Sequence, residues 1–328
     1  MKDSEPAPPT PRHTPNDAAI GSMWPQLPLA PWQPTYETLH MWTQIVGKTR
    51  LALAPLQNHW WQVTLYPTVR GLSTGTMPCE GRTVEIEFDF RDHVLAIRCN
   101  DGRNEVLPLA AMPVARFFAS YMEALRALDI QVRLHAIPVE IVTAIPFERD
   151  VEHATYDADA ANRHWRILLQ VQRVFQMFRS RFVGKASPVH FFWGSFDLAT
   201  TRFSGRSAPR HPGGAPNCPD YVMVEAYSQE CASWGFWPGG GIIREAAFYA
   251  YAYPEPAGYP QHRVEPDAAY YHPELHEFVL PYEAVRSASN PDETLLAFLQ
   301  STYEAAADLA KWDRATIDRP RVQWLGLG

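Results

Sequence analysis

The stretch VEIEFDF, residues 84–90, decides the fold class, because apolar and acidic residues alternate in it without a break. Period-two alternation is the pattern of a β-strand, so the four apolar residues share one face and Glu85, Glu87 and Asp89 share the other. We interpret the acidic face as exposed to solvent, although three carboxylates at this spacing could also bind calcium. Residues 94–99, across a short turn, are the expected antiparallel partner.

Helices and further strands are predicted on both sides of this hairpin. Apolar residues recur at helical spacing over 36–54, 112–128 and 159–182. A last helix is expected from Asn290, because Asn at the N-cap, Pro at the first position and acids in the first turn favour a helix start. Further strands are predicted at 60–65, 130–137, 190–197, 198–204, 247–253 and 277–285. Antiparallel strands with helices on one sheet face predict an α+β fold.

The order helix, antiparallel sheet, helix occurs twice along the chain. Local echoes in the same order favour an internal duplication: Val46-Gly47-Lys48 with Val183-Gly184-Lys185, His59-Trp60-Trp61 with His190-Phe191-Phe192, and Thr68-Val69-Arg70 with Thr200-Thr201-Arg202. We predict two diverged repeats, residues 23–147 and 148–313, packed about a pseudo-twofold axis. Residues 1–22, rich in proline, are expected to be a disordered tail, and residues 314–328 a C-terminal tail.

Composition and charge argue against several classes of protein. The chain of 328 residues has a formal net charge of −7, which is unfavourable for a nucleic-acid surface. No apolar run approaches the ~18–20 residues of a membrane span, and no signal-peptide pattern opens the chain. The four cysteines form no C-x-x-C pair, which argues against structural zinc. We expect a cytoplasmic protein that binds neither nucleic acid nor membrane, with its cofactors, metal content and oligomeric state left open.

Several long runs resemble a bacterial family that is catalogued only as a domain of unknown function. The runs that carry this resemblance are TYETLHMWTQ at 35–44, HFFWGSFD at 190–197, FSGR at 203–206, HPGG at 211–214 and FWPGG at 236–240. The resemblance extends from residue 24 to about residue 313. It implies no activity, cofactor or catalytic residue.

The two predicted repeats differ most at residues 205–245, where the second carries a long and aromatic insertion. Loops of this length in compact domains are commonly lids or binding loops. The strand at 247–253 places Tyr249, Tyr251 and Tyr253 on one face, which is unlike a solvated face. We therefore expect the insertion to close over these tyrosines and to form an aromatic-walled pocket for a small molecule.

Candidate site residues follow from this pocket. The candidate catalytic residues are His211 as an acid–base group, with Asp197 and Glu225 orienting it or sharing a bound metal. The candidate ligand-binding residues are Trp193, Ser195, Arg202, Trp234, Trp237, Tyr249 and Tyr251. Each polar candidate also has a structural interpretation: Asp197 would cap a turn or pair with an arginine, His211 would be a turn residue, and Glu225 would face solvent.

Two functions of different classes fit these residues. The first is an enzyme that acts on a small flat or ringed molecule, with or without the help of a metal. The second is a non-catalytic module that binds a small molecule or a protein. A third interpretation is that the tyrosine face packs against the insertion as a second core with no pocket. The number of polar groups favours the enzyme slightly, but none of them forms a diagnostic motif.

Overall fold

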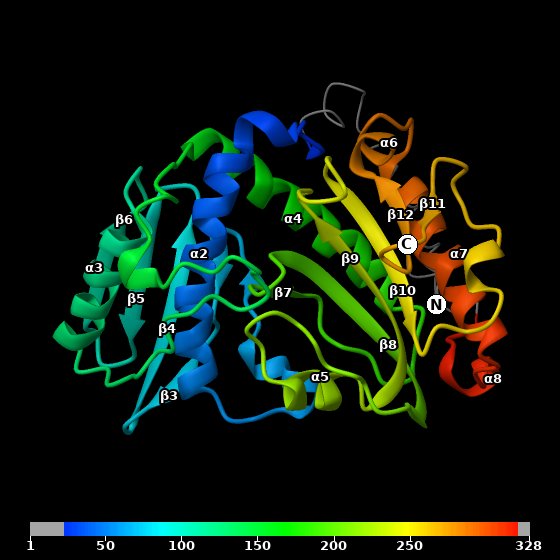
Figure 1. The fold of residues 1–328 in the computed structure, drawn as a ribbon, viewed down its shortest axis with the longest axis horizontal. Coiled ribbons are helices and arrows are strands. Elements are labelled where there is room, and N and C mark those ends of the chain that lie inside the picture. Colours follow the sequence, from blue (N-terminus) through cyan, green and yellow to red (C-terminus); the bar gives the residue numbers. More distant parts are fainter. Residues whose placement is uncertain (1–22, 321–328) are drawn as a thin grey trace, which may run out of the picture.

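The computed structural model describes residues 23–320, which form two antiparallel sheets with the long helices packed against them (Figure 1). The α+β class is therefore confirmed. The first sheet has the strand order β1-β2-β4-β5-β6, with β3 paired to β4, and the second has the order β7-β8-β9-β10-β12-β11. The strands are β1 Tyr66–Pro67, β2 Gly71–Ser73, β3 Met77–Cys79, β4 Arg82–Asp89, β5 Val94–Cys99, β6 Asn104–Pro108, β7 His190–Phe192, β8 Asp197–Ser207, β9 Gln229–Trp237, β10 Ala247–Tyr253, β11 Tyr270–His272 and β12 Glu277–Pro281.

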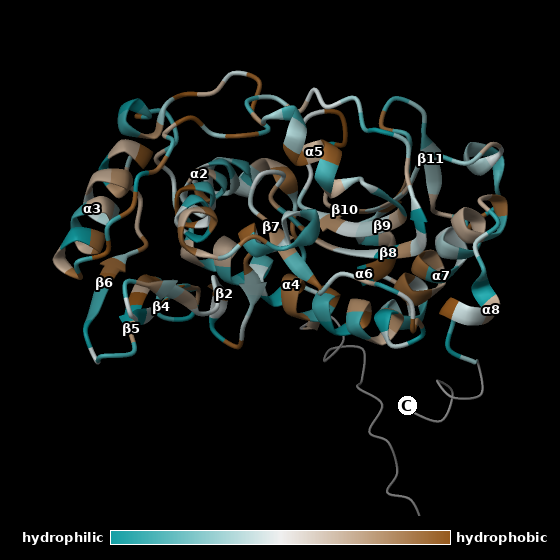
Figure 2. Ribbon diagram, turned by 90° about the horizontal axis from the view of Figure 1, so that it is seen from below, coloured by the Kyte–Doolittle hydropathy of each residue, from teal (hydrophilic) through white to brown (hydrophobic). Residues whose placement is uncertain are grey.

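Four long helices bury the apolar faces of these sheets. Helices α2 (Leu29–Leu53) and α3 (Val114–Ala127) pack against the first sheet, and α4 (Ala158–Arg179) and α7 (Pro291–Leu309) against the second. Figure 2 shows hydrophobic and hydrophilic residues side by side along α3 and α4, as expected of helices with one buried side. The shorter helical elements are η1 Asn58–Val63, η2 Phe147–Arg149, α5 Asp220–Ala226, η3 Tyr259–Gln261, α6 Tyr282–Arg286 and α8 Arg314–Ile317.

The hairpin predicted around residues 84–99 is present as β4 and β5, but its acidic face is not solvated. Glu87 and Asp89 are only 7% and 2% exposed. Arg98 pairs with Glu87 at 2.9 Å, and Arg70 pairs with Asp89. The prediction of a solvated face was wrong because alternation reports which residues share a face, and not what lies over that face.

Four predicted strands have different bounds or do not form. Residues 60–65 lie largely in η1, where His59 and Trp60 have left-handed φ angles of 58° and 62° that no strand tolerates. No strand forms over 130–137, which runs as irregular chain beside α2. The predicted strand 190–197 is cut by a turn at 193–196, and the predicted strand 277–285 ends at Pro281, where α6 begins.

Much of the segment 205–245, which was expected to be an insertion over the sheet, belongs to the sheet itself. Its second part is β9, which lies between β8 and β10 with Ser233 opposite Thr201 and Tyr251. A short helix, α5, spans Asp220–Ala226 and ends before β9 begins. Only residues 208–228, which include α5, remain as a connection that can cover the sheet face.

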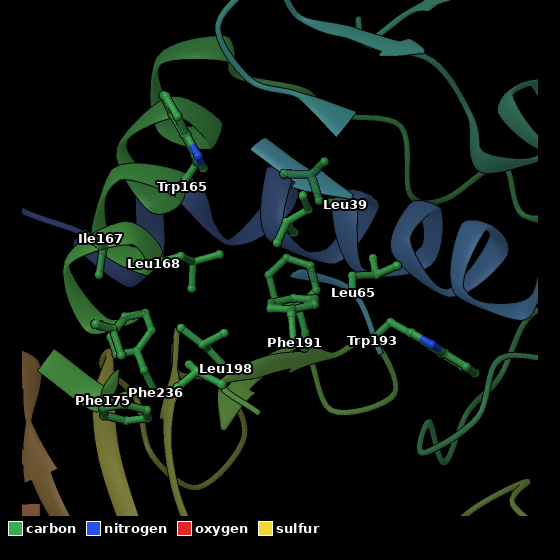
Figure 3. Packing of buried hydrophobic residues seen from close by; sticks show 14 of the residues in the cluster. Leu39, Leu65, Trp165, Ile167, Leu168, Phe175, Phe191, Trp193, Leu198 and Phe236 are labelled. Atoms are coloured by element: carbon green, nitrogen blue, oxygen red, sulfur yellow. The ribbon is translucent and has the colours of Figure 1, made fainter. Parts of the chain in front are cut away.

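The two sheets meet at a two-bond backbone bridge between Leu65 and Phe191. Each amide donates to the other residue's carbonyl oxygen, at 2.9 and 2.7 Å. Figure 3 shows both side chains buried together with Leu39 of α2 and Trp193 nearby. Gly47 of α2 lets the Trp193 ring approach, since a Cβ at position 47 would lie 2.3 Å from it. The sheets therefore share one continuous core.

The local echoes that favoured a duplication fall in different elements. His59-Trp60-Trp61 lies in η1 and His190-Phe191-Phe192 in β7, while Val46-Gly47-Lys48 lies in α2 and Val183-Gly184-Lys185 follows α4. The duplication and the pseudo-twofold packing stay predictions. The expected tail at 1–22 lies outside the described residues, whereas residues 314–320 of the expected C-terminal tail include α8 and pair with the chain after α4. None of the helices within 23–320 is both long and apolar enough to cross a membrane.

Helix α7 begins as its sequence predicts, with Asn290 accepting a hydrogen bond from the Glu293 amide. We expect Asn290→Ala to lower the free energy of unfolding by about 1 kcal/mol, because an amide at the helix start loses its acceptor. Asn290→Asp, which keeps the acceptor, should behave like the wild type in urea denaturation. Equal stability of all three proteins would contradict the capping role.

Candidate functional site

The face of the second sheet that lies opposite α4 and α7 carries the polar and aromatic groups of the candidate site. Strand register places Tyr249 opposite Gly235 and Tyr251 opposite Ser233, so these four residues share that face. We call it the tyrosine face. Its members Tyr249, Tyr251, Tyr253 and Trp237 are all partly buried, and Figure 1 shows α5 on this side of the sheet.

Tyr249 reaches across the neighbouring strand to a buried carboxyl group. Its ring lies directly over Gly235, where a Cβ would be 2.3 Å from the phenol oxygen. The Tyr249 hydroxyl donates to Asp197, which is 4% exposed, and the Ser195 hydroxyl donates to the other oxygen of the same carboxyl group. Burial raises the pKa of Asp197. Asp197 forms no ion pair with any residue from 23 to 320.

Two glutamates lie within electrostatic reach of Asp197. Burial raises the pKa of both Glu140 and Glu277 to about 7, and the negative charge of Asp197 adds to each shift. Glu277 begins β12 on the tyrosine face, two residues before Val279, which pairs with Tyr249. Neither glutamate forms an ion pair within the described chain.

Glu140 comes from the irregular chain beside α2 rather than from the sheet. Its carboxyl oxygen lies against Gly194, since a Cβ at position 194 would be 2.2 Å from it. The backbone is held with φ at 59°, and its amide donates to the carbonyl oxygen of Pro216 at 2.7 Å. Surrounding protein atoms raise the pKa of this carboxyl although the residue keeps much of its surface in contact with solvent. A left-handed non-glycine residue costs free energy, which this local packing must offset.

A row of aromatic rings leads from Asp197 to His211. The rings of Tyr249 and Tyr251 are stacked at 6.0 Å, and the Tyr251 and Tyr227 hydroxyls are 2.7 Å apart. His211 stacks on Tyr227 at 4.7 Å, and its Nδ1 accepts a hydrogen bond from the Gly213 amide. Burial lowers the pKa of His211. Residues 208–228 thus contribute Tyr227 and His211 to the edge of the tyrosine face.

The structure brings together only part of the predicted site. Ser195, Asp197 and Tyr249 are hydrogen-bonded, Tyr251 adjoins them, and Trp237 lies on the same face. His211 makes no hydrogen bond to Asp197 or Glu225 within residues 23–320, and Glu225 is exposed on α5. The expectation that His211, Asp197 and Glu225 act as one unit is therefore corrected, because the rings of Tyr249, Tyr251 and Tyr227 separate His211 from Asp197.

Three predicted ligand-binding residues lie away from the tyrosine face. Trp234 is buried under α7 and donates to Thr302 at 2.8 Å. Arg202 is buried on the same helix-covered side, against Phe178 of α4. Trp193 packs on Gly47 of α2 and donates to the carbonyl oxygen of Val63. They were grouped with Asp197 because the turn at 193–196 and the central place of β9 were not foreseen.

Three residues of the site were missed at the sequence level: Glu140, Glu277 and Tyr227. Glu277 has a usable signal, since at the start of a strand it shares a face with Val279 and alternates with Phe278. Glu140 has none, because the chain around it has no periodicity. Among residues 23–320, no three His, Cys, Asp or Glu side chains are grouped so that they could hold a metal ion.

Comparison with known proteins adds a family relationship but no activity. A family model matches the chain over residues 24–319. No curated protein and no solved structure matches it. The site itself therefore carries the evidence on function.

Proposed function

The chain belongs to a family of unknown function, DUF5996, so membership brings no activity with it, and we propose a function from the site alone. The proposed function is that of an acid–base enzyme that acts on a small ringed molecule carrying a protonated nitrogen. The ligand would lie on the tyrosine face. The observation that carries this proposal is the group of three carboxyls, Asp197, Glu140 and Glu277, with no ion pair inside the described chain.

A cationic ligand is favoured because it supplies the missing countercharge. Carboxylates removed from water are costly to ionise, and an ammonium group within hydrogen-bonding distance offsets that cost. The rings of Tyr249, Tyr251 and Trp237 add a second attraction, since aromatic faces attract cations and stack on flat ligands. A neutral or anionic ligand would gain only the ring contacts.

Acid–base chemistry is favoured because Glu140 and Glu277 have pKa values of about 7. A carboxyl group with this pKa exists in both protonation states near neutral pH, so it can give or take a proton during a reaction. Asp197 would fix the position of the ring hydroxyl of Tyr249 and keep the local potential negative. His211, at the edge of the face, would contact the distal part of the ligand.

Binding of benzylamine against benzyl alcohol tests the charge requirement, because the two have similar size and only the amine is cationic at neutral pH. We expect the amine to bind at least about tenfold more tightly, as one charge-assisted hydrogen bond contributes roughly 1.5–3 kcal/mol. Its affinity should fall when the pH drops through 7, because Glu140 and Glu277 then become neutral. Isothermal titration calorimetry at several pH values measures both effects.

A matched pair of variants controls for loss of charge alone. Glu277→Gln should weaken benzylamine binding about tenfold, whereas Glu274→Gln, in the exposed turn before β12, should leave it unchanged. Equal affinities for the amine and the alcohol would overturn the proposal.

A second candidate is the non-catalytic binding module, favoured by the lack of any hydrogen bond between His211 and the three carboxyls within the described chain. Amine binding that does not change between about pH 5.5 and pH 8.5 would favour this module, since proton transfer needs groups that titrate in that range.

A further inference from the structure

A hollow of about 930 Å³ lies on the helix-covered side of the second sheet, where α7, α8 and the chain after α4 come together. Figure 1 shows α7 and α8 side by side in this region, away from α5. The volume is within the range of small-molecule sites. Its lining contains five arginines, among them Arg202 and Arg314, and four acids, among them Asp318.

Arg202 of β8 is the buried member of this lining and is 1% exposed. Its guanidinium carbon lies 3.5 Å from the ring centroid of Phe178 and 4.4 Å from that of Tyr303. Nη2 donates to the carbonyl oxygen of Phe178, but Nε is buried and has no hydrogen-bond partner. Arg202 forms no ion pair with any residue from 23 to 320.

A buried guanidinium without a carboxylate is unfavourable unless something else compensates it. Stacking on Phe178 and Tyr303 compensates only part of the lost hydration, and it leaves the charge itself unpaired. Asp318, whose negative charge favours the protonated form of Arg202, is already bound by Arg314 at 2.9 Å and by the Tyr303 hydroxyl. An anion that reaches Arg202 from the hollow would supply the missing countercharge.

Other cations border the same space. Arg314 lies on α8 and Arg181 follows α4, and both raise the positive potential around Arg202. Arg319 lies on the chain after α8. Guanidinium groups that come from several directions suit an oxyanion with acceptors on several sides better than a planar carboxylate, which one arginine can bind by itself.

We propose that this hollow binds a small phosphorylated molecule, with the phosphate against Arg202 and the remainder of the ligand along Tyr303 and Leu296. The site is separate from the tyrosine face, because Arg202 and Asp197 lie on opposite faces of β8. It would act as a second ligand site or as the place where a charged cosubstrate is held.

Calorimetric titration of the full chain with inorganic phosphate, at constant ionic strength in a chloride buffer, tests this assignment. We expect saturable binding, and we expect Arg202→Met to weaken it at least about tenfold. The same variant should keep or raise the melting temperature, because Met fits among Phe178 and Tyr303 without a buried charge. A marked fall in its melting temperature would mean that Arg202 is a structural residue and would count against the site.

Two further variants separate binding from folding. Arg206→Met removes an arginine from the same strand but outside the hollow, and should leave phosphate binding unchanged. Ala297→Glu places an acid in the lining from α7 without touching Arg202, and should abolish phosphate binding while Ala297→Gln retains it. Benzylamine binding should be the same in all of these proteins.

Three results would overturn the proposal: no phosphate binding by the wild type, equal binding by Arg202→Met, or tighter binding of benzoate than of phosphate. The last result would assign the hollow to carboxylates instead. A wild-type protein that binds phosphate but not benzylamine would count against the proposed function of the tyrosine face. The same result would still support the phosphate site.

Discussion

Gly235→Ala is expected to lower the free energy of unfolding by about 3 kcal/mol and to abolish benzylamine binding. The added methyl group would lie 2.3 Å from the ring and hydroxyl of Tyr249, which crosses β9 at this point. Overpacking of a buried position commonly costs roughly 1–3 kcal/mol. Here the ring cannot move without losing its hydrogen bond to Asp197, which is buried and needs that donor.

A double-mutant cycle identifies the cause of this loss. Tyr249→Ala removes the ring that the new methyl group would strike, so the pair Gly235→Ala and Tyr249→Ala should be more stable than the sum of the single effects predicts. Tyr249→Phe keeps the ring and removes only the hydroxyl, and so measures the hydrogen bond alone. Urea denaturation of the wild type, the two alanine variants and their double variant gives the coupling free energy between positions 235 and 249. A Gly235→Ala protein as stable as the wild type would show that the Tyr249 ring is not held over β9.

Glu277→Gln is expected to make the protein more stable above pH 7, although it removes a proposed site residue. Burial raises the pKa of Glu277 from 4.5 to about 7, and the charge of Asp197 adds to the shift. Between about pH 4.5 and pH 7 the unfolded chain releases this proton while the folded chain keeps it. The unfolded state therefore binds fewer protons, and the free energy of unfolding falls as the pH rises through this interval.

The expected gain for Glu277→Gln is about 2 kcal/mol near pH 8 and close to zero near pH 4. Each unit of pKa shift corresponds to about 1.4 kcal/mol, and partial contact with solvent reduces the full value. Glu274→Gln, which removes a carboxyl from the exposed turn before β12, is the matched control. Thermal denaturation over pH 4–8 measures the difference. A gain that is the same at every pH would contradict a titration of Glu277 in this range.

If both predictions hold, the site residues lower the free energy of unfolding in order to keep groups that the proposed function needs. Carboxyl groups with raised pKa values destabilise the folded state, and substitutions that relieve them commonly improve stability at the expense of function. Glu140 fits the same account, since its left-handed backbone and its raised pKa both disfavour the folded state locally.

The sequence predicts the elements with strong periodicity and misses what covers them. The strands at 84–90 and 247–253 and the helix from Asn290 appear where the patterns place them, because alternation and capping are local properties. The burial of the β4 face that carries Glu87 could not be predicted in the same way. It depends on Arg70 and Arg98, which other elements bring to that face.

The candidate site likewise contains residues that local alternation predicts and residues that it misplaces. Asp197 and Tyr249 were placed in one group because both lie in alternating strands, and they are hydrogen-bonded. Trp193 and Trp234 were placed with them in error, since extrapolating the alternation through residues 193–196 assumes a continuous strand where the chain turns. The strand β9 falls in the segment that was expected to be an insertion, and the small residue at 235 is what allows the Tyr249 ring to pass.

The bridge between Leu65 and Phe191 has a consequence for self-association. Unpaired strand edges are templates for aggregation, and here an edge of each sheet is occupied by the other, since the bridge joins the ends at β1 and β7. Within the described chain the remaining edge strands are then β6, which ends in a proline and carries Asn104 and Glu105, and β3 and β11, which are three residues long each. All three are poor templates, so the protein should resist edge-to-edge polymerisation even at the high concentrations used for structural work.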